Sequence, residues 1–76
     1  MTEMELRQRM IKKIKYRMIT EHIHQNDLSE MTGIPRQTIG RYLNYDRKPT
    51  YDNIVRIAHA LNISLDELIN TNEPIE

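Results

Sequence analysis

The stretch from Gln25 to Asn44, which reads QNDLSEMTGIPRQTIGRYLN, constrains the fold of this chain more than any other. Two short segments compatible with helices flank a Thr-Gly-Ile-Pro corner, and Gly33 stands inside that corner. A chain that ends one helix and starts another within three or four residues usually needs one residue at positive φ, which glycine adopts without steric cost. The pattern predicts two helices that pack across a tight turn, with Gly33 as its pivot.

The residues around Gly33 divide into an apolar set and an exposed face. The apolar residues, spaced to face one another across the corner, are Leu28, Met31, Ile34, Ile39, Tyr42 and Leu43. Ser29 is small, which suits a place where two helices cross closely, and we expect Ile39 to press against it. The opposite face of the second helix has no acidic member and carries Arg36, Gln37, Thr38, Gly40 and Arg41. Such a unit is a helix-turn-helix motif.

Three further helices are predicted from periodicity and capping. Apolar residues at three- and four-residue intervals indicate an amphipathic helix over about residues 4–20, with a basic opposite face. Thr50 is a good N-cap for a helix that ends at Asn62. The apolar stripe of that helix consists of Tyr51, Ile54, Val55, Ala58 and Leu61. Ser64 and Glu67 have the spacing of a capping box, which starts a last helix with Leu65, Leu68 and Ile69 available to the core.

The predicted fold class is all-α, a compact five-helix domain with the helix-turn-helix at its second and third helices. The 76 residues form one predicted domain. A chain of this size buries only about 60% of the surface that its unfolded form exposes, so its core must be compact. We expect the core within about residues 4–70 and a frayed tail over residues 71–76. Pro35 suits the first turn of the third helix, because its φ is already near the helical value.

Residues 25–44 resemble the helix-turn-helix of the lambda-repressor-like domains, the family of the phage repressors and Cro. The resemblance rests on Gln25, on Ser29 four residues later, on Gly33 eight residues later, and on the apolar Ile34, Ile39 and Tyr42. Residues 47–69 resemble the last two helices of the same family. The resemblance implies sequence-specific binding of double-stranded DNA, with the third helix in the major groove.

Arg36, Gln37 and Arg41 occupy the positions that read bases in the resembling family. Arg can donate two hydrogen bonds to guanine and Gln can pair with adenine, and each good pair contributes about 1–3 kcal/mol of discrimination. Thr38 is placed to touch a thymine methyl group or a phosphate, and the resemblance implies that Gln25 braces Gln37. The alternative interpretation is an ordinary solvated helix face, but two Arg and one Gln in these positions are uncommon by chance.

The predicted phosphate contacts flank the base-reading residues. The resemblance implies that Gln25 donates to a phosphate. Asn44, Arg47 and Lys48 end the third helix and follow it, where phosphate contacts position a protein without reading sequence. A solvated loop is the alternative for Arg47 and Lys48. Arg17 is placed to reach the DNA backbone, whereas the rest of the basic run in the first helix is better explained as a solvated face.

Two departures from the family pattern stand out. Many relatives pair an Arg late in the first helix with a Glu at the end of the third, where this chain has Met18 and Leu43; a shift of one residue would align Arg17 instead. An apolar pair can replace a buried ion pair at little or no cost in stability. Pro35 stands where relatives often have a Ser or Thr cap, and it removes a hydroxyl and an N–H that phosphate could meet.

The charge distribution matters more than the charge sum. Net charge is zero, with 11 Lys and Arg against 11 Asp and Glu, which by itself argues against a nucleic-acid partner. However, residues 7–17 contain basic residues and no acid, and residues 33–49 contain Asp46 as their only acid. The charged residues among the last 15 are all acidic. A molecule with one basic face is steered toward phosphate.

Composition excludes or disfavours several other classes. With no Cys and 2 Gly, the chain has no disulfide framework, thiolate zinc site or glycine-rich phosphate loop. We expect no metal site, because no paired acidic cluster accompanies His22, His24 and His59. We also expect no cofactor, no small-molecule ligand and no catalytic residue. No apolar run approaches the roughly 20 residues of a membrane span. We expect a cytoplasmic protein encoded by a prokaryote or a phage.

These features predict a transcriptional regulator, and a small repressor that occupies its operator is the favoured interpretation. An antitoxin or a restriction-modification controller, which share this domain, is the runner-up. A protein-interaction module that lost DNA binding is the alternative from another class, and an enzyme is the least favoured. We expect a weak homodimer on an inverted-repeat operator, with contacts drawn from Ile63, Leu65, Ile69 and Ile75.

Overall fold

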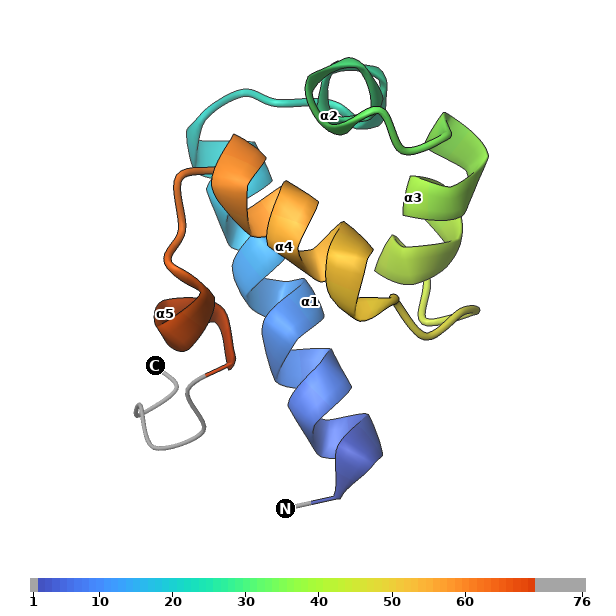
Figure 1. Ribbon diagram of the computed structural model, residues 1–76, viewed down its shortest axis with the longest axis vertical. Helices are drawn as coiled ribbons and strands as arrows, with labels where there is room; N and C mark the ends of the chain where they lie inside the picture. The colour runs from blue at the N-terminus through green and yellow to red at the C-terminus, as the bar shows by residue number, and fades with distance from the viewer. Residues whose placement is uncertain (1, 70–76) are drawn as a thin grey trace.

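The computed structural model describes residues 2–69, and all regular secondary structure in this range is helical. The helices are α1 (Glu3–Thr20), α2 (Gln25–Thr32), α3 (Arg36–Leu43), α4 (Tyr51–Ala60) and α5 (Leu65–Ile69). Figure 1 shows α4 crossing α1, with α2 and α3 at one end of the molecule and α5 beside α1. The all-α, five-helix prediction is confirmed. The predicted frayed tail, residues 71–76, lies outside the described residues.

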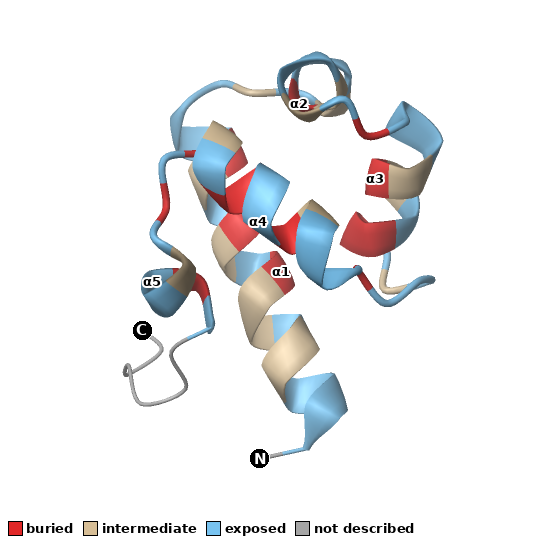
Figure 2. Cartoon of the chain, in the orientation of Figure 1, coloured by how far each residue is buried: buried red, intermediate tan, exposed pale blue. Residues whose placement is uncertain are grey.

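One hydrophobic core joins the helices, and Figure 2 shows its buried residues where the helices face one another. Its buried members are Ile11, Ile14, Met18, Leu28, Ile34, Ile39, Tyr42, Leu43, Ile54, Ile57, Ala58, Leu61, Ile63 and Leu68. Full burial of one such large apolar side chain contributes about 1.5–3 kcal/mol, so this cluster is the main source of stability. Met31 is not a member: its side chain is 50% exposed, which corrects its predicted core position.

The buried face of α4 differs from the predicted stripe. Tyr51 is 71% exposed and Val55 is 39% exposed, whereas Ile57 is 2% exposed. The buried residues are Ile54, Ile57, Ala58 and Leu61, which have the i, i+3, i+4, i+7 spacing of one helix face, so this face meets the core and the face through Tyr51 and Val55 does not. The helix also ends at Ala60, two residues earlier than predicted.

Hydroxyl groups cap the starts of the last two helices, α4 and α5. Thr50 Oγ1 accepts from the backbone N–H of Asn53 at 3.2 Å, and Ser64 Oγ accepts from that of Glu67 at 3.0 Å. The Thr50 cap is confirmed, and of the predicted Ser64–Glu67 capping box the bond to the Ser64 hydroxyl is present; each such cap typically stabilises a helix by about 1 kcal/mol. Pro35, by contrast, precedes α3 with φ −55° and ψ 137°, so it is the N-cap residue and not part of the first turn.

Two residues after the end of three of the helices, a residue other than glycine has a positive φ, in the left-handed region. These residues are His22 (φ 57°) after α1, Tyr45 (φ 62°) after α3 and Asn62 (φ 56°) after α4. In each case the next N–H turns back onto the last turn of the helix: Ile23 N–H donates to Met18 O, Asp46 N–H to Arg41 O and Ile63 N–H to Ala58 O, at 2.8–2.9 Å. These bonds satisfy carbonyls that a helix end leaves unpaired and direct the chain toward the next helix.

Candidate nucleic-acid interface

Helix α3 has one buried face and one exposed face. Ile39 and Tyr42 are 0% and 1% exposed, and Leu43 is also buried, so the three residues form a single apolar stripe. Since the remaining positions of an eight-residue helix lie on the other side, Arg36, Gln37 and Arg41 face outward, and all three are exposed. The sequence thus determines which side of α3 meets a partner.

The turn between α2 and α3 is closed by hydrogen bonds. Gly33 has φ 79°, in the left-handed region, and its N–H donates to Ser29 O at 2.8 Å. The Ser29 hydroxyl donates to Ile34 O at 2.6 Å, and Ile34 N–H donates to the hydroxyl oxygen of Thr32 at 3.1 Å. Ser29 therefore does more than allow close packing: its hydroxyl links α2 to the residue that leads into α3.

Tyr42 anchors α3 to α4. Its hydroxyl oxygen accepts a hydrogen bond from Asn53 Nδ2 at 2.7 Å, within the first turn of α4. A Tyr hydroxyl usually finds such a partner when its ring is buried. This contact, which no local sequence pattern indicates, helps to set the orientation of α3 relative to the rest of the domain.

A shallow hollow lies between the start of α2 and the exposed side of α3. Its lining residues are Gln25, Arg36, Gln37, Gly40, Arg41 and Asn44. We call this set the recognition face. It contains two arginines and no acidic residue, so its potential favours an anion. Thr38 is half-buried and does not line the hollow.

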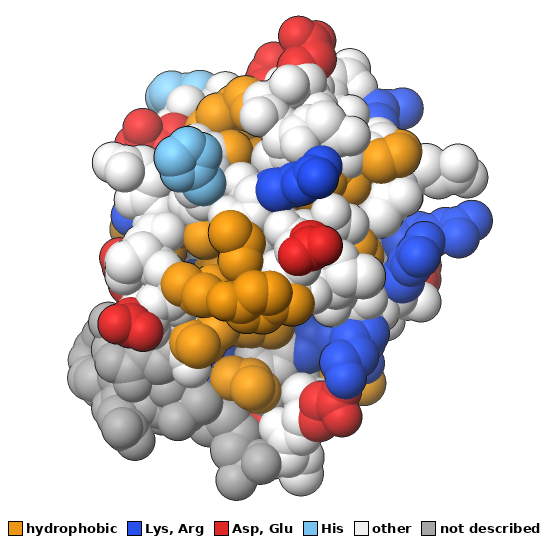
Figure 3. All heavy atoms as spheres, viewed as in Figure 1, with side chains coloured by type: hydrophobic (Ala, Val, Ile, Leu, Met, Phe, Trp, Pro, Cys, Tyr) orange, Lys and Arg blue, Asp and Glu red, His pale blue; other side chains and the backbone are white. Residues whose placement is uncertain are grey.

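The loop after α3 adds two exposed basic residues, Arg47 and Lys48. Figure 3 shows Lys and Arg side chains along the edge of the molecule near α3 and this loop. Lys48 forms an ion pair with Glu3, and its hydrogen bond lowers the pKa of the Glu3 carboxyl below the ordinary value. Both side chains are about two-thirds exposed, at 67% and 68%. An ion pair this exposed contributes little stability, so a phosphate can replace Glu3 as the partner of Lys48.

Arg17 is not part of this surface, contrary to the expectation from sequence. Its Nη1 donates to Leu61 O at 3.0 Å and to Asn62 O at 3.4 Å, and its Nη2 lies 3.9 Å from Glu67 Oε2. Lys13, one turn earlier on α1, donates to Glu67 O at 2.6 Å. The guanidinium is therefore committed to the carbonyls that end α4, and Arg17 is not among the proposed phosphate contacts.

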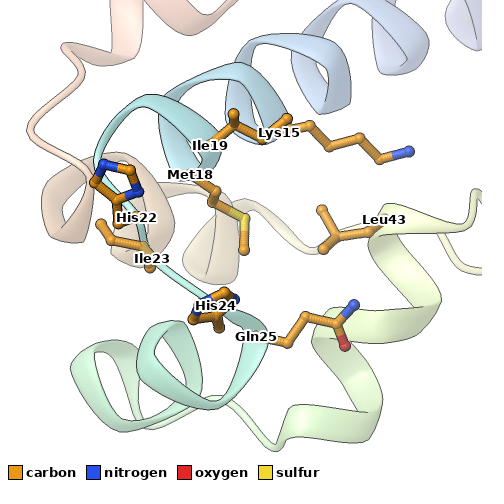
Figure 4. A pocket seen from close by; sticks show the side chains of 8 residues that line it. All are labelled: Lys15, Met18, Ile19, His22, Ile23, His24, Gln25 and Leu43. Atoms are coloured by element: carbon orange, nitrogen blue, oxygen red, sulfur yellow. The ribbon is translucent and has the colours of Figure 1, made fainter.

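Met18 and Leu43 stand where the resemblance to the lambda-repressor-like domains implies an ion pair. Both side chains are 7% exposed. They line an apolar hollow between α1, the start of α2 and the end of α3, shown in Figure 4. Met18 and Leu43 therefore lie close together where the ion pair would be, and Arg17, which a shift of one residue would align there, points to the end of α4.

A helix-turn-helix whose second helix exposes one polar face is the motif with which many DNA-binding proteins contact DNA. The chain matches the model of the helix-turn-helix family HTH_3 over residues 14–68. It belongs to this lambda-repressor-like family of DNA-binding transcription regulators. No curated protein and no solved structure matches the chain in the corresponding comparisons.

Two other kinds of site, a metal site and a membrane span, find no support among residues 2–69. No group of three or more His, Cys, Asp or Glu side chains in this range is arranged to hold a metal ion. None of the described helices is both long enough and apolar enough to span a membrane. The recognition face is the candidate site that the described residues support best, because it places two arginines and no acidic residue on one exposed surface.

Proposed function

We propose that this protein is a small repressor that binds double-stranded DNA in a sequence-specific manner, with α3 in the major groove. The observation that carries the proposal is the recognition face. Its long polar side chains extend from a helix whose opposite side is locked into the core by Ile39 and Tyr42. A rigid helix holds its side chains in the register that discrimination between base pairs requires.

In this proposal Arg36, Gln37 and Arg41 read base edges. All three are exposed, and side chains near the start of a recognition helix reach the bases. The two arginines would donate to guanine and Gln37 would pair with adenine. Thr38 is assigned a lesser contact, to a thymine methyl group or a phosphate, because it is half-buried beside the recognition face.

Gln25, Asn44, Arg47 and Lys48 are proposed to contact phosphates. Gln25 and Asn44 line the hollow at its edges, and Arg47 and Lys48 follow in the loop. Each phosphate neutralised by a basic side chain releases counterions, so binding to any sequence should weaken as salt rises. Repression would follow from occupation of the operator.

The recognition face also bears on the alternatives. A protein-interaction module that had lost DNA binding would have no need for two arginines on an acid-free face, which favours DNA as the partner. An antitoxin or a restriction-modification controller would use the same face for DNA and would differ in the gene that it controls.

Selection of bound sequences from a random pool of double-stranded DNA tests the proposal. We expect enrichment of one sequence. Gln37→Ala and Arg41→Ala should each relax the preference at particular positions, by about 1–3 kcal/mol of discrimination, whereas Lys48→Ala should weaken binding to all sequences alike. A selected sequence that Gln37→Ala leaves unchanged at every position would show that the recognition face is misplaced. A failure to enrich any sequence would contradict the proposed function itself.

A further inference from the structure

Gly40 lies in the middle of α3 and needs a physical explanation. Its φ is not positive, since Gly33 is the only described glycine in that region. Glycine inside a helix is less favourable than alanine, because it loses more backbone freedom on folding. The backbone conformation at position 40 therefore gives no reason for glycine, and the reason must lie in what surrounds it.

The side chain of Gln25 provides that reason. A Cβ at position 40 would lie 3.3 Å from Gln25 Oε1, slightly closer than the 3.4–4 Å of ordinary contacts of a Cβ atom. In Figure 4 this side chain extends from the start of α2 toward α3. The amide of Gln25 thus lies over the bare Cα of Gly40.

The two ends of Gln25 face different surroundings. It borders the apolar hollow that also contains Met18 and Leu43, and it lines the recognition face together with Arg41. The amide is thus the point at which α2 meets the exposed side of α3. A methyl group at position 40 would displace this amide by a few tenths of an ångström.

We propose that Gly40 is a positioning residue for DNA binding: its missing side chain lets the Gln25 amide lie against α3, in the place from which it contacts the DNA backbone. This inference rests on the proposed function. It assigns to Gly40 a role through Gln25 and no direct contact with DNA.

The test is a double-mutant cycle of Gly40→Ala and Gln25→Ala, measured as the dissociation constant for the selected DNA site. Gly40→Ala alone should weaken binding about threefold to tenfold, because it moves the amide donor out of alignment with the phosphate and weakens that one hydrogen bond. In the Gln25→Ala background the same change should have no further effect. The melting temperature of Gly40→Ala should equal or exceed that of the wild type, since alanine is the better helix former.

The possible outcomes separate the inference from the function on which it rests. Equal loss of affinity from Gly40→Ala in both backgrounds would mean that the methyl group meets DNA directly, which overturns the positioning role. No loss in either background would overturn it as well. In both cases the wild type would still select a sequence, and only a wild type that selects none would bring down the proposed function.

Discussion

At the scale of single residues, Gly33 allows the sharpest prediction. A Cβ at this position would meet Arg56 Nη1 at 3.9 Å, an ordinary contact, so space is available and only φ 79° demands glycine. Gly33→Val should destabilise the domain by about 1–3 kcal/mol, the cost of holding a β-branched residue in this region. Gly33→Asn is the matched control, because Asn tolerates the left-handed region, and should cost less. If Gly33→Val and the wild type unfold at the same urea concentration, the turn does not depend on glycine.

Tyr42 gives a second prediction at this scale. Tyr42→Phe removes the hydroxyl that accepts from Asn53 and leaves the ring in the core, so the free energy of unfolding should fall by about 1 kcal/mol. Asn53→Ala in the Tyr42→Phe background should then add little, because its partner is already gone. If the loss of unfolding free energy in the double variant equals the sum of the losses in the two single variants, Tyr42 and Asn53 are not energetically coupled.

The residue scale also shows where sequence reasoning stops. The positive φ of Gly33 was predictable because a short corner between two helices usually requires one residue in the left-handed region, and glycine is the residue that adopts it most readily. The left-handed conformations of His22 and Tyr45 were not predictable, since nothing in those residue types requires them. The partner of Tyr42 and the neighbour of Gly40 were missed for a related reason: each contact joins two helices, and no local pattern reports it.

At the scale of helices, Arg17 distinguishes packing from DNA contact. Arg17→Met keeps an apolar stem but removes the hydrogen bonds to Leu61 O and Asn62 O, so we expect a loss of about 1–2 kcal/mol in unfolding free energy. Lys12→Met, on the exposed side of the same helix, is the control and should change stability little. The salt dependence of DNA binding should be unaltered by Arg17→Met. A slope of log affinity against log salt that is smaller by about 0.9 would instead restore Arg17 as a phosphate contact.

The helices themselves were largely predictable from sequence, and the misses have a common cause. The end of α2 at Gly33 agrees with the prediction, because a glycine stop is a local signal. For α4, the start at Thr50 was correct, but the buried face was assigned from an apolar stripe that includes the exposed Tyr51 and Val55. Two overlapping apolar stripes can be drawn on α4, one through Tyr51 and Val55 and one through Ile57, and which of them is covered depends on packing that the local sequence does not report. The same limit accounts for the wrong prediction that Met31 belongs to the core.

At the scale of the whole molecule, the residues expected to join two copies of the protein on DNA have to be revised. Ile63 is 6% exposed and belongs to the core, so it is not available to a second copy. Leu65 is half-buried, and Ile75 lies outside the described residues. Exposed apolar side chains remain on α4 and α5 at Tyr51, Val55 and Ile69. Figure 3 shows hydrophobic side chains gathered where α4 passes over α1 beside α5, a surface that contains no residue of the recognition face.

The size of the domain fits two copies on one operator. Recognition helices of a twofold pair lie about 34 Å apart, in successive major grooves. The backbone of the domain extends over 31 × 23 × 19 Å, a length comparable with that spacing, so two copies bound in successive grooves would lie near one another. A stable dimer usually buries about 800 Å² on each partner, more than three scattered apolar side chains provide. We therefore predict a monomer or a monomer–dimer equilibrium in solution, and cooperative binding of two copies to an inverted repeat.

Sedimentation of the protein on its selected DNA site measures this directly, with two copies expected on each site. Ile69→Lys should reduce the cooperativity of binding and leave the affinity of a single copy for a half-site unchanged, because Ile69 is 42% exposed on α5 and distant in sequence from α3. Tyr16→Lys, which changes a 71% exposed residue on α1, is the matched control and should leave cooperativity intact. A single copy bound to a sequence without inverted symmetry would contradict the dimer. Two copies whose cooperativity is lost with Tyr16→Lys but not with Ile69→Lys would place the contact on α1 instead of α5.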